Sequence, residues 1–311
     1  AGLQVNIVNM QQGEVVALYN YMAQMIVELI KLASLIITLN KSAACAGRVA
    51  DILKVKTSMS YPKTSAVPSS DATALAFENV TFAYAGSSAP SLSNISFSVQ
   101  KGQTVGIIGG TGSGKSTLVN LIARFYDASQ GTVRIDGQDI RSYSQQTLRQ
   151  KIGVVPQRAA LFKGTIRENM KWGRDDATDA EIWDALTTAQ AREIVEGKDG
   201  QLDFRLEQNG RNLSGGQRQR LTIARALVKK PRVLILDDSA SALDYATDAA
   251  LRKAIRQMEG APTVFIVSQR TSSLMSADRI LVLDDGEATG YGTHEDCLLY
   301  TSDAADDLTR V

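Results

Sequence analysis

The stretch GGTGSGKST, from Gly109 to Thr117, decides the fold of this 311-residue chain. It satisfies the pattern G-x-x-x-x-G-K-S/T and follows an apolar run that is typical of a buried parallel strand. Its glycines allow backbone N–H groups to surround phosphates, and a helix that opens at Lys115 adds the positive end of its dipole. We therefore expect Lys115 to reach the β and γ phosphates of a nucleotide and Ser116 to ligate Mg²⁺. The predicted phosphate-binding residues are Gly110, Thr111, Gly112, Ser113, Gly114, Lys115, Ser116 and Thr117.

The composition limits the partners of the chain. Its 34 basic side chains nearly balance 33 acidic ones, and a net charge of +1 gives no argument for a nucleic-acid partner. An apolar fraction of 44 % is enough for a folded core, and the length suggests about two domains. Cys45, Cys297 and the single His294 cannot assemble a Cys/His metal site. The sequence begins without Met or a signal-peptide pattern, so we expect it to be part of a longer protein.

A long apolar segment precedes the nucleotide motif. Residues 15–39, VVALYNYMAQMIVELIKLASLIITL, are long enough as a helix to cross a hydrocarbon core of roughly 30 Å. The polar residues of this segment recur at helical spacing on one face, and they are Asn20, Gln24, Glu28, Lys31 and Thr38. Because charged side chains are costly in lipid, this face is expected to line a watery cavity while the remainder contacts membrane lipid. An amphipathic helix of a soluble bundle is the alternative.

The flanking charges predict the orientation of this helix. Residues 1–30 contain no Lys or Arg, whereas Lys41, Arg48, Lys54 and Lys56 follow the apolar run. Basic residues are enriched on the cytoplasmic side of membrane helices, so the C-terminal side is expected to be cytoplasmic. We place the end of a membrane domain at 1–56. Residues 57–75 are rich in Ser, Thr, Ala and Pro, and they are interpreted as a linker.

Alternating apolar residues predict two strands before the phosphate loop. Residues 77–84, FENVTFAY, place Val80, Phe82 and Tyr84 on one face, and Ile95, Phe97 and Val99 alternate in the next strand. Tyr84 ends its strand, where it is either a core residue or a platform on which an adenine stacks. A helix is expected after the phosphate loop, over residues 118–126.

Two apolar strands downstream end in polar residues that suit a metal–nucleotide site. The run IGVVPQ ends at Gln157, whose carbonyl can ligate Mg²⁺ while its amide points at a γ phosphate. The run VLILD ends at Asp237, the position at which P-loop enzymes hold Mg²⁺ through a carboxylate, and Asp238 follows it. Further buried strands are expected at 263–268, followed by Gln269, and at 279–285.

A second glycine-rich stretch, LSGGQ, occupies residues 213–217 and opens a predicted helix. A serine and two glycines that permit close approach make it a second anion site, although a capped helix start alone would have the same pattern. Residues from about 158 to 230 interrupt the strand alternation with helical patterns. They are interpreted as an inserted helical subdomain.

Taken in this order and spacing, these motifs resemble an ATP-binding cassette over residues 76–296. LSGGQ separates that family from kinases, G proteins and other P-loop NTPases. The resemblance implies an α/β P-loop NTPase fold with a mixed, largely parallel core sheet, an antiparallel β subdomain and the helical subdomain, with ATP and Mg²⁺ as cofactors. Residues 1–56 resemble the last transmembrane helix of the exporter class, which implies five further helices, a plasma-membrane location and a cytoplasmic nucleotide domain.

In this family two cassettes meet head to tail, and each ATP lies between one phosphate loop and the signature stretch of the partner. The resemblance therefore assigns Leu213, Ser214, Gly215, Gly216 and Gln217 to the partner's ATP, and Asp244 to the D-loop segment SALD. The transported substrate cannot be deduced from one membrane helix.

Two catalytic positions depart from the active family pattern. Asp238 stands where a glutamate usually orients water, and Gln269 stands where a histidine usually acts as a switch. Aspartate withdraws the carboxylate by about 1 Å, and a misplacement of that size can cost roughly 10²-fold in rate. Glutamine carries no proton or positive charge at neutral pH. The hypothesis is one half of a heterodimeric exporter that binds ATP and hydrolyses it poorly at its own site.

Three alternatives remain open. They are a homodimeric exporter with two active sites, a soluble cassette ATPase without transport, and a purely regulatory ATP-binding subunit. A soluble cassette would not need residues 15–39. The last stretch, 297–311, resembles the translation of a transposase adapter used in DNA sequencing, and it is expected to lack a folded role.

Overall fold

The computed structural model describes residues 11–55, 57, 59–65, 73–239, 242–268 and 274–297. The chain divides into two compact units, residues 1–58 and residues 59–311. Gln269, which the sequence assigns to the catalytic site, lies outside the described residues, and so do residues 298–311.

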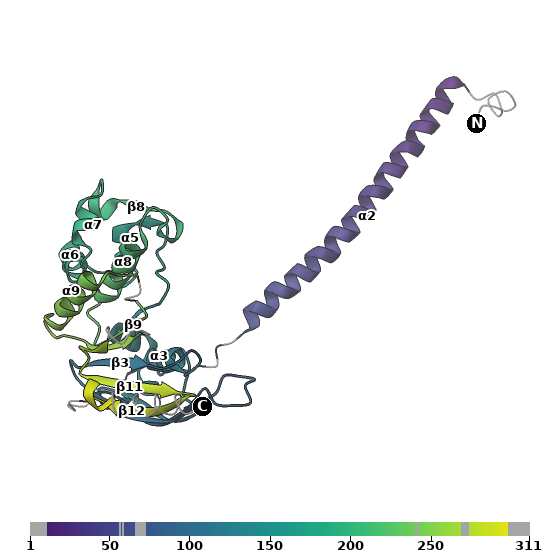
Figure 1. Ribbon diagram of the computed structural model, residues 1–311. Helices are drawn as coiled ribbons and strands as arrows, with labels where there is room; N and C mark the ends of the chain where they lie inside the picture. The colour runs from purple at the N-terminus through teal and green to yellow at the C-terminus, as the bar shows by residue number, and fades with distance from the viewer. Residues whose placement is uncertain are drawn as a thin grey trace, which may run out of the picture. The chain divides into compact units, whose positions relative to one another are not determined.

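The described part of the first unit contains one helix, α2 (Gln12–Lys54), of 43 residues (Figure 1). It is long and apolar enough to cross a membrane by length and composition, and none of its residues is buried. The expected polar face carries a short ladder of side-chain contacts, because the Glu28 carboxylate accepts hydrogen bonds from Gln24 at 3.2 Å and from Lys31 at 2.9 Å. Pairing within the helix reduces the cost of these charges in an apolar setting.

The described part of the second unit contains an antiparallel sheet in the order β2-β1-β4-β5. Its strands are β1 (Thr73–Phe82), β2 (Leu92–Gln100), β4 (Gln130–Ile135) and β5 (Gln138–Asp139). The predicted alternation in β2 is confirmed, since Ile95, Phe97 and Val99 are all buried. Phe77 in β1 stacks on Phe97 with ring centroids 4.9 Å apart.

A second sheet has the order β12-β11-β3-β10-β9-β6, and β3, β6, β9, β10 and β11 are parallel. Its strands are β3 (Thr104–Ile108), β6 (Ile152–Val155), β9 (Val233–Asp237), β10 (Thr263–Val267), β11 (Arg279–Asp284) and β12 (Glu287–Gly292). Both faces of this sheet are covered. In β9, Ile235 faces the core shared with β1 and β2, whereas Leu234 faces the core shared with the helices. Continuous apolar runs are therefore the expected sequence pattern for these strands.

Helices flank this sheet and form a separate group beyond β9 (Figure 1). They are α3 (Lys115–Ile122), α4 (Gln145–Lys151), α5 (Ile166–Lys171), α6 (Asp179–Thr188), α7 (Arg192–Glu196), α8 (Gly215–Leu227) and α9 (Tyr245–Arg256). The described residues of this unit also form three 3₁₀ turns, η1 (Ile140–Ser142), η2 (Gln201–Asp203) and η3 (Gln208–Gly210), and a small strand pair, β7 (Gly164–Thr165) with β8 (Arg205–Leu206). Helices α5 to α8 fall within the interval expected for a helical subdomain, and α8 packs on α5 and α6.

The helix after the phosphate loop ends earlier than the sequence predicts. It stops at Ile122 rather than at Tyr126, because Arg124 adopts a left-handed backbone with φ +51°. The guanidinium of Arg124 is thereby directed inward. Its side chain is 1 % exposed and pairs with Asp127 at 2.8 Å.

Parts of the predicted linker 57–75 belong to the folded domain. The Ser60 carbonyl accepts a hydrogen bond from Arg124, and the Tyr61 ring lies 4.3 Å from the centre of that guanidinium. The Ser65 hydroxyl lies 2.8 Å from that of Thr147. Strand β1 begins at Thr73, so its pairing with β2 extends three residues into the expected linker.

Cys297, which was expected to lack a folded role, packs against the end of the domain. Cys297 is 7 % exposed, its N–H donates to the Thr293 carbonyl, and its thiol lies 3.7 Å from the Ile280 carbonyl. Cysteine behaves as a small apolar residue, which suits this contact with β11. Cys297 therefore has a packed position, in contrast to the expectation that it lacks one.

Candidate nucleotide-binding site

The phosphate loop, Gln157 and Asp237 lie at one edge of the parallel sheet. Strands β3, β10 and β9 are adjacent and parallel, and β6 lies beside β9. Their carboxyl ends therefore lead into the phosphate loop, Ser268, Asp237 and Gln157 respectively. Open parallel sheets bind ligands at this edge.

The phosphate loop needs glycine at positions that the backbone defines. Gly114 has φ +96°, and a Cβ there would lie 2.6 Å from the Leu92 side chain and 2.9 Å from the Ser91 carbonyl. At Gly109, with φ +158°, a Cβ would lie 2.2 Å from the Leu283 carbonyl. The loop is thus held closely between the start of β2 and the end of β11. Gly114 caps α3 without a side-chain bond, which leaves the first N–H groups of the helix available to an anion.

Lys115 binds carbonyl groups of the phosphate loop, and its charge affects the pKa of Asp237. Its ammonium donates to the carbonyls of Gly109 at 2.7 Å and of Gly110 at 2.5 Å. Burial raises the pKa of Asp237, the neighbouring charge of Asp238 raises it further, and the charge of Lys115 lowers it. The charges of Lys115 and Asp237 therefore interact, whereas their roles toward phosphate and Mg²⁺ stay predictions.

Asp238 and Gln157 meet directly across two strands. The Gln157 amide donates to the Asp238 carboxylate at 3.2 Å. Asp238 has φ +44°, and its backbone N–H donates to the Val267 carbonyl at 2.9 Å, which fixes the turn after β9. A left-handed backbone at a non-glycine residue is uncommon, and aspartate is among the residues that tolerate it. The site thus holds this carboxylate in a defined place beside Gln157.

Tyr84 packs against the core, which is one of the two settings that the sequence allows, and its stacking on an adenine stays a prediction. Its ring packs edge-on against Phe82 at 4.9 Å and Tyr126 at 5.2 Å between ring centroids, and its hydroxyl lies 3.2 Å from that of Thr117. Tyr84 is half-buried beside the phosphate-loop helix. The sequence did not indicate the contact between Tyr84 and Thr117, because 33 residues separate them.

The signature stretch forms the start of α8. The Ser214 hydroxyl accepts the Gln217 N–H at 3.3 Å, and the Gln217 side chain accepts the Ser214 N–H at 3.1 Å. This reciprocal capping box fixes the loop geometry. Leu213 is buried beneath it. A Cβ at Gly215 would meet no atom within 4 Å, so this glycine faces open space, whereas one at Gly216 would lie 3.1 Å from the Ala242 carbonyl.

A cavity of about 600 Å³ joins Gln157, Gly215 and Ala242. Asp244 lies two residues further on, where its carboxylate caps α9 by accepting the Thr247 N–H at 2.9 Å. That hydrogen bond is the largest of the causes that lower the pKa of Asp244.

The signature stretch and the D-loop segment are therefore neighbours, and Lys115 and Asp237 form a separate cluster at the sheet edge. Such an arrangement of phosphate loop, carboxylate and parallel sheet defines a P-loop NTPase.

Comparison with known proteins identifies the family more closely. Residues 92–241 match the model of the ABC transporter family. A solved bacterial Atm1-family ABC exporter with ATP bound has a TM-score of 0.78 and 32 % identity, over 96 % of this chain and 52 % of that chain. The chain therefore carries the ATP-binding cassette of an ABC transporter, a domain that hydrolyses ATP.

Two relatives are about twice as long as the chain. An uncharacterized ABC transporter ATP-binding protein of Mycobacterium tuberculosis is 39 % identical, over 98 % of this chain and 53 % of the relative. A probable multidrug resistance ABC transporter ATP-binding/permease protein of Bacillus subtilis is 39 % identical, over 92 % of this chain and 49 % of the relative. The chain spans about half the length of these relatives.

Proposed function

We propose that this chain is the C-terminal part of one half of a heterodimeric ABC exporter, which binds ATP at its own site and hydrolyses it slowly. The observation that carries the proposal is an intact signature stretch together with two altered catalytic positions, Asp238 and Gln269. The signature would complete the ATP site of a partner subunit. The chain's own phosphate loop would receive the partner's signature.

The residues fit a magnesium–nucleotide complex by their chemistry. Ser116, Gln157 and Asp237 offer hydroxyl, amide and carboxylate oxygens, which are ligands that Mg²⁺ prefers. These three residues would hold Mg²⁺, which when bound would supply positive charge to offset the charge of the phosphates. Lys115 and the N–H groups at the start of α3 would hold the phosphates. Tyr84 would stack on the adenine.

Slow hydrolysis follows from the position of Asp238. Its carboxylate is held 3.2 Å from the Gln157 amide, and its side chain is one methylene shorter than the usual glutamate. We infer that it does not reach the attacking water well, and that Gln269 cannot compensate because it lacks a charge. The partner's site, with its own catalytic residues and this chain's Ser214, would carry most of the turnover.

Helix α2 supports an exporter over a soluble cassette. The helix is long and apolar enough to span a membrane, and the relatives that align with it are named as ABC transporter proteins. Its stripe of polar side chains, including the bonded Glu28 and Lys31, would face the translocation pathway. The transported substrate would pass along this stripe in the plasma membrane, with the cassette in the cytoplasm.

The test uses the asymmetry between the two sites. The full-length protein is co-expressed with candidate partner half-transporters, and phosphate release is measured for pairs that carry a single substitution in this chain. Ser214→Ala should reduce turnover of the pair at least tenfold, because it damages the partner's working site. Asp238→Asn should change it less than about twofold, because this chain's own site contributes little. Equal losses from the two substitutions would favour two equivalent sites and would refute the proposal.

A further inference from the structure

Three aromatic rings form a closed group at the end of β1. The ring centroids of Phe82 and Tyr84 are 4.9 Å apart, those of Tyr84 and Tyr126 are 5.2 Å apart, and those of Phe82 and Tyr126 are 5.5 Å apart. Tyr84 meets its two neighbours edge to face, with interplanar angles of 84° and 87°. Aromatic rings favour this arrangement because the positive edge of one ring faces the negative face of another. Each ring is therefore held by the other two.

This three-ring group joins two parts of the nucleotide site. Phe82 is the last residue of β1, and Tyr84 lies two residues beyond it. Tyr126 follows four residues after Ile122, the last residue of α3, and α3 begins at the phosphate loop. The hydroxyl of Tyr84 lies 3.2 Å from that of Thr117, in the first turn of the same helix. Tyr84 therefore contacts a residue near the start of α3 and a residue just after its end.

The backbone around Tyr126 is fixed by contacts that do not involve its ring. The buried guanidinium of Arg124, two residues earlier, pairs with Asp127 at 2.8 Å. Ser129 binds the end of β1 twice, because its N–H donates to a carbonyl of β1 at 3.0 Å and its hydroxyl accepts the Ala83 N–H at 3.3 Å. The segment that carries Tyr126 is thus anchored beside the residue that precedes Tyr84.

Tyr84 itself depends on its neighbours for its orientation. It lies after β1 in neither a helix nor a strand, so regular secondary structure does not fix its ring. Phe82 is 4 % exposed and supports the ring from the core, whereas Tyr126 is 43 % exposed and supports it from the surface side. Without Tyr126, one of the two edge-to-face contacts of Tyr84 is lost. The ring would then have more conformational freedom before a ligand binds.

We propose that Tyr126 is a positioning residue for the nucleotide base, which holds the Tyr84 ring in the orientation that receives an adenine. The inference rests on the proposed stacking of adenine on Tyr84. A ring that is already ordered loses less conformational freedom when a ligand binds, so the affinity for a nucleotide that carries a base increases. The phosphates are bound by other groups. Tyr126 therefore contributes to the affinity for ATP and not to the affinity for a triphosphate without a base.

The test compares ATP with a phosphate chain that has no base. Affinities of the detergent-solubilised full-length protein for Mg-ATP and for Mg-tripolyphosphate are measured by displacement of a fluorescent ATP analogue, whose own affinity is measured for each variant. Tyr126→Ala should lower the affinity for ATP by about fivefold or more and that for tripolyphosphate by less than about twofold, because only the base uses the ring contact. Equal losses for the two ligands would indicate a structural role in the phosphate loop and would overturn the proposal.

Matched variants separate the ring from its surroundings. Tyr126→Phe keeps the ring and should retain the ATP affinity of the wild type within about twofold. Phe125→Ala is the control, because Phe125 is the neighbouring residue, is 58 % exposed and does not belong to the three-ring group. It should also change the ATP affinity by less than about twofold. If Tyr126→Ala does not fold, as judged by tripolyphosphate binding, Tyr126→Leu replaces it and should likewise weaken ATP selectively.

A double variant tests whether Tyr126 acts through Tyr84. Tyr84→Ala should weaken ATP binding, and the addition of Tyr126→Ala should cause less than about a twofold further loss, because the ring that Tyr126 positions is already absent. Losses that multiply would mean that Tyr126 acts independently, which contradicts a positioning role. A loss with Tyr84→Ala but not with Tyr126→Ala would refute the positioning role alone. Unchanged ATP affinity in Tyr84→Ala would refute the proposed stacking, and the inference with it.

Discussion

Replacing Arg124 with Met should destabilise the nucleotide domain strongly, because this buried guanidinium binds groups from three separate segments. Its side chain is 1 % exposed and binds the Asp127 carboxylate at 2.8 Å. It also donates to the Ser60 carbonyl at 2.8 Å and to the Ile140 carbonyl at 3.3 Å. Met has a similar length but no donor, so the substitution leaves these three acceptors without their partner.

The expected magnitude follows from burial. Removing one partner of a buried ion pair costs about 3–5 kcal/mol. For a domain of this size, about 1 kcal/mol lowers the melting midpoint by roughly 2–4 °C, so the expected fall is about 6–20 °C. Arg134→Met is the matched control, because Arg134 pairs with Glu78 at the same distance of 2.8 Å, yet both side chains are at least 40 % exposed. Exposed pairs contribute about 0–1 kcal/mol, so the control should fall by less than about 4 °C.

The assay is thermal unfolding of the detergent-solubilised chain, followed by tryptophan fluorescence. Both tryptophans of the chain, Trp172 and Trp183, lie in the nucleotide domain, so the signal reports on that domain. Equal midpoints for Arg124→Met and Arg134→Met would refute the reasoning, since they would mean that the buried contacts of Arg124 contribute no more than an exposed pair.

Two further predictions concern Gly114 of the phosphate loop and the amine of Lys229. Gly114→Ala should lower affinity for a fluorescent ATP analogue at least tenfold, because the new Cβ would lie 2.6 Å from the Leu92 side chain. Gly86→Ala is the control, because Gly86 has a similar φ of +83° and a Cβ there would meet no atom within 4 Å. This control variant should bind the analogue normally. Lys229 should be acetylated with a midpoint near pH 8, because burial lowers its pKa to about that value, whereas an ordinary lysine amine has a pKa of about 10.4. A profile of Lys229 that coincides with those of exposed lysines would contradict the second prediction.

The strands and the phosphate loop were predictable because their signals are local. Glycines, a Lys-Ser pair and a continuous apolar run identify the loop and β3 from adjacent residues alone. The same reasoning placed Asp237 and Gln157 at strand ends, and the parallel register then brings those ends to one edge of the sheet. Long apolar strands leave few alternative structures, so the sequence was sufficient to predict these strands and the residues at their ends.

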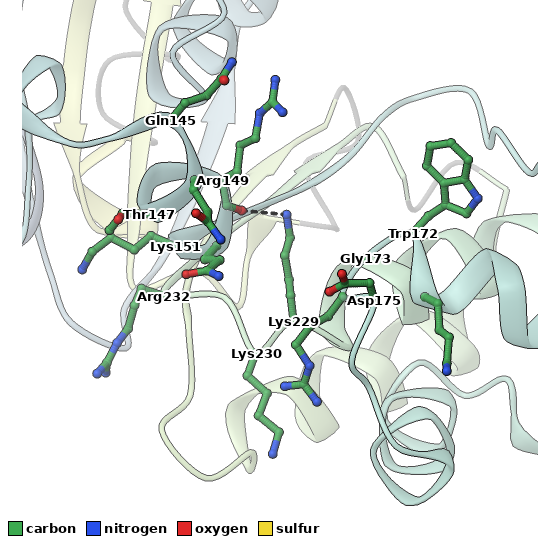
Figure 2. A pocket seen from close by; sticks show the side chains of 14 residues that line it. Gln145, Thr147, Arg149, Lys151, Trp172, Gly173, Asp175, Lys229, Lys230 and Arg232 are labelled. Carbon is green, nitrogen blue, oxygen red and sulfur yellow. Dashed lines mark hydrogen bonds between the residues drawn. The ribbon is translucent and has the colours of Figure 1, made fainter. Parts of the chain in front are cut away.

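Contacts between distant segments were not predictable in the same way. Residues 57–75 have the composition of a linker, yet Ser60 lies against Arg124, 64 residues later, and Ser65 against Thr147. The early end of α3 has the same origin, because Arg124 leaves the helix to reach these partners. The composition of a segment indicates its local conformation. It does not indicate whether a charged side chain is buried, because the hydrogen-bond acceptors come from another segment. The sequence also did not predict the cavity lined by Arg149, Lys171 and Lys229 (Figure 2), because three separate segments contribute its cations.

The most direct test of the central claim is turnover by the full-length protein expressed without a partner. Mg-ATP binding and phosphate release are measured for the wild type and for Asp238→Glu combined with Gln269→His. The account predicts that the wild type binds Mg-ATP with little turnover, and that the double substitution raises turnover by about 10²-fold, since each change restores a catalytic group that the wild type lacks. Brisk turnover by the wild type alone, with no gain from the double substitution, would contradict the slow-site hypothesis and favour a homodimeric exporter.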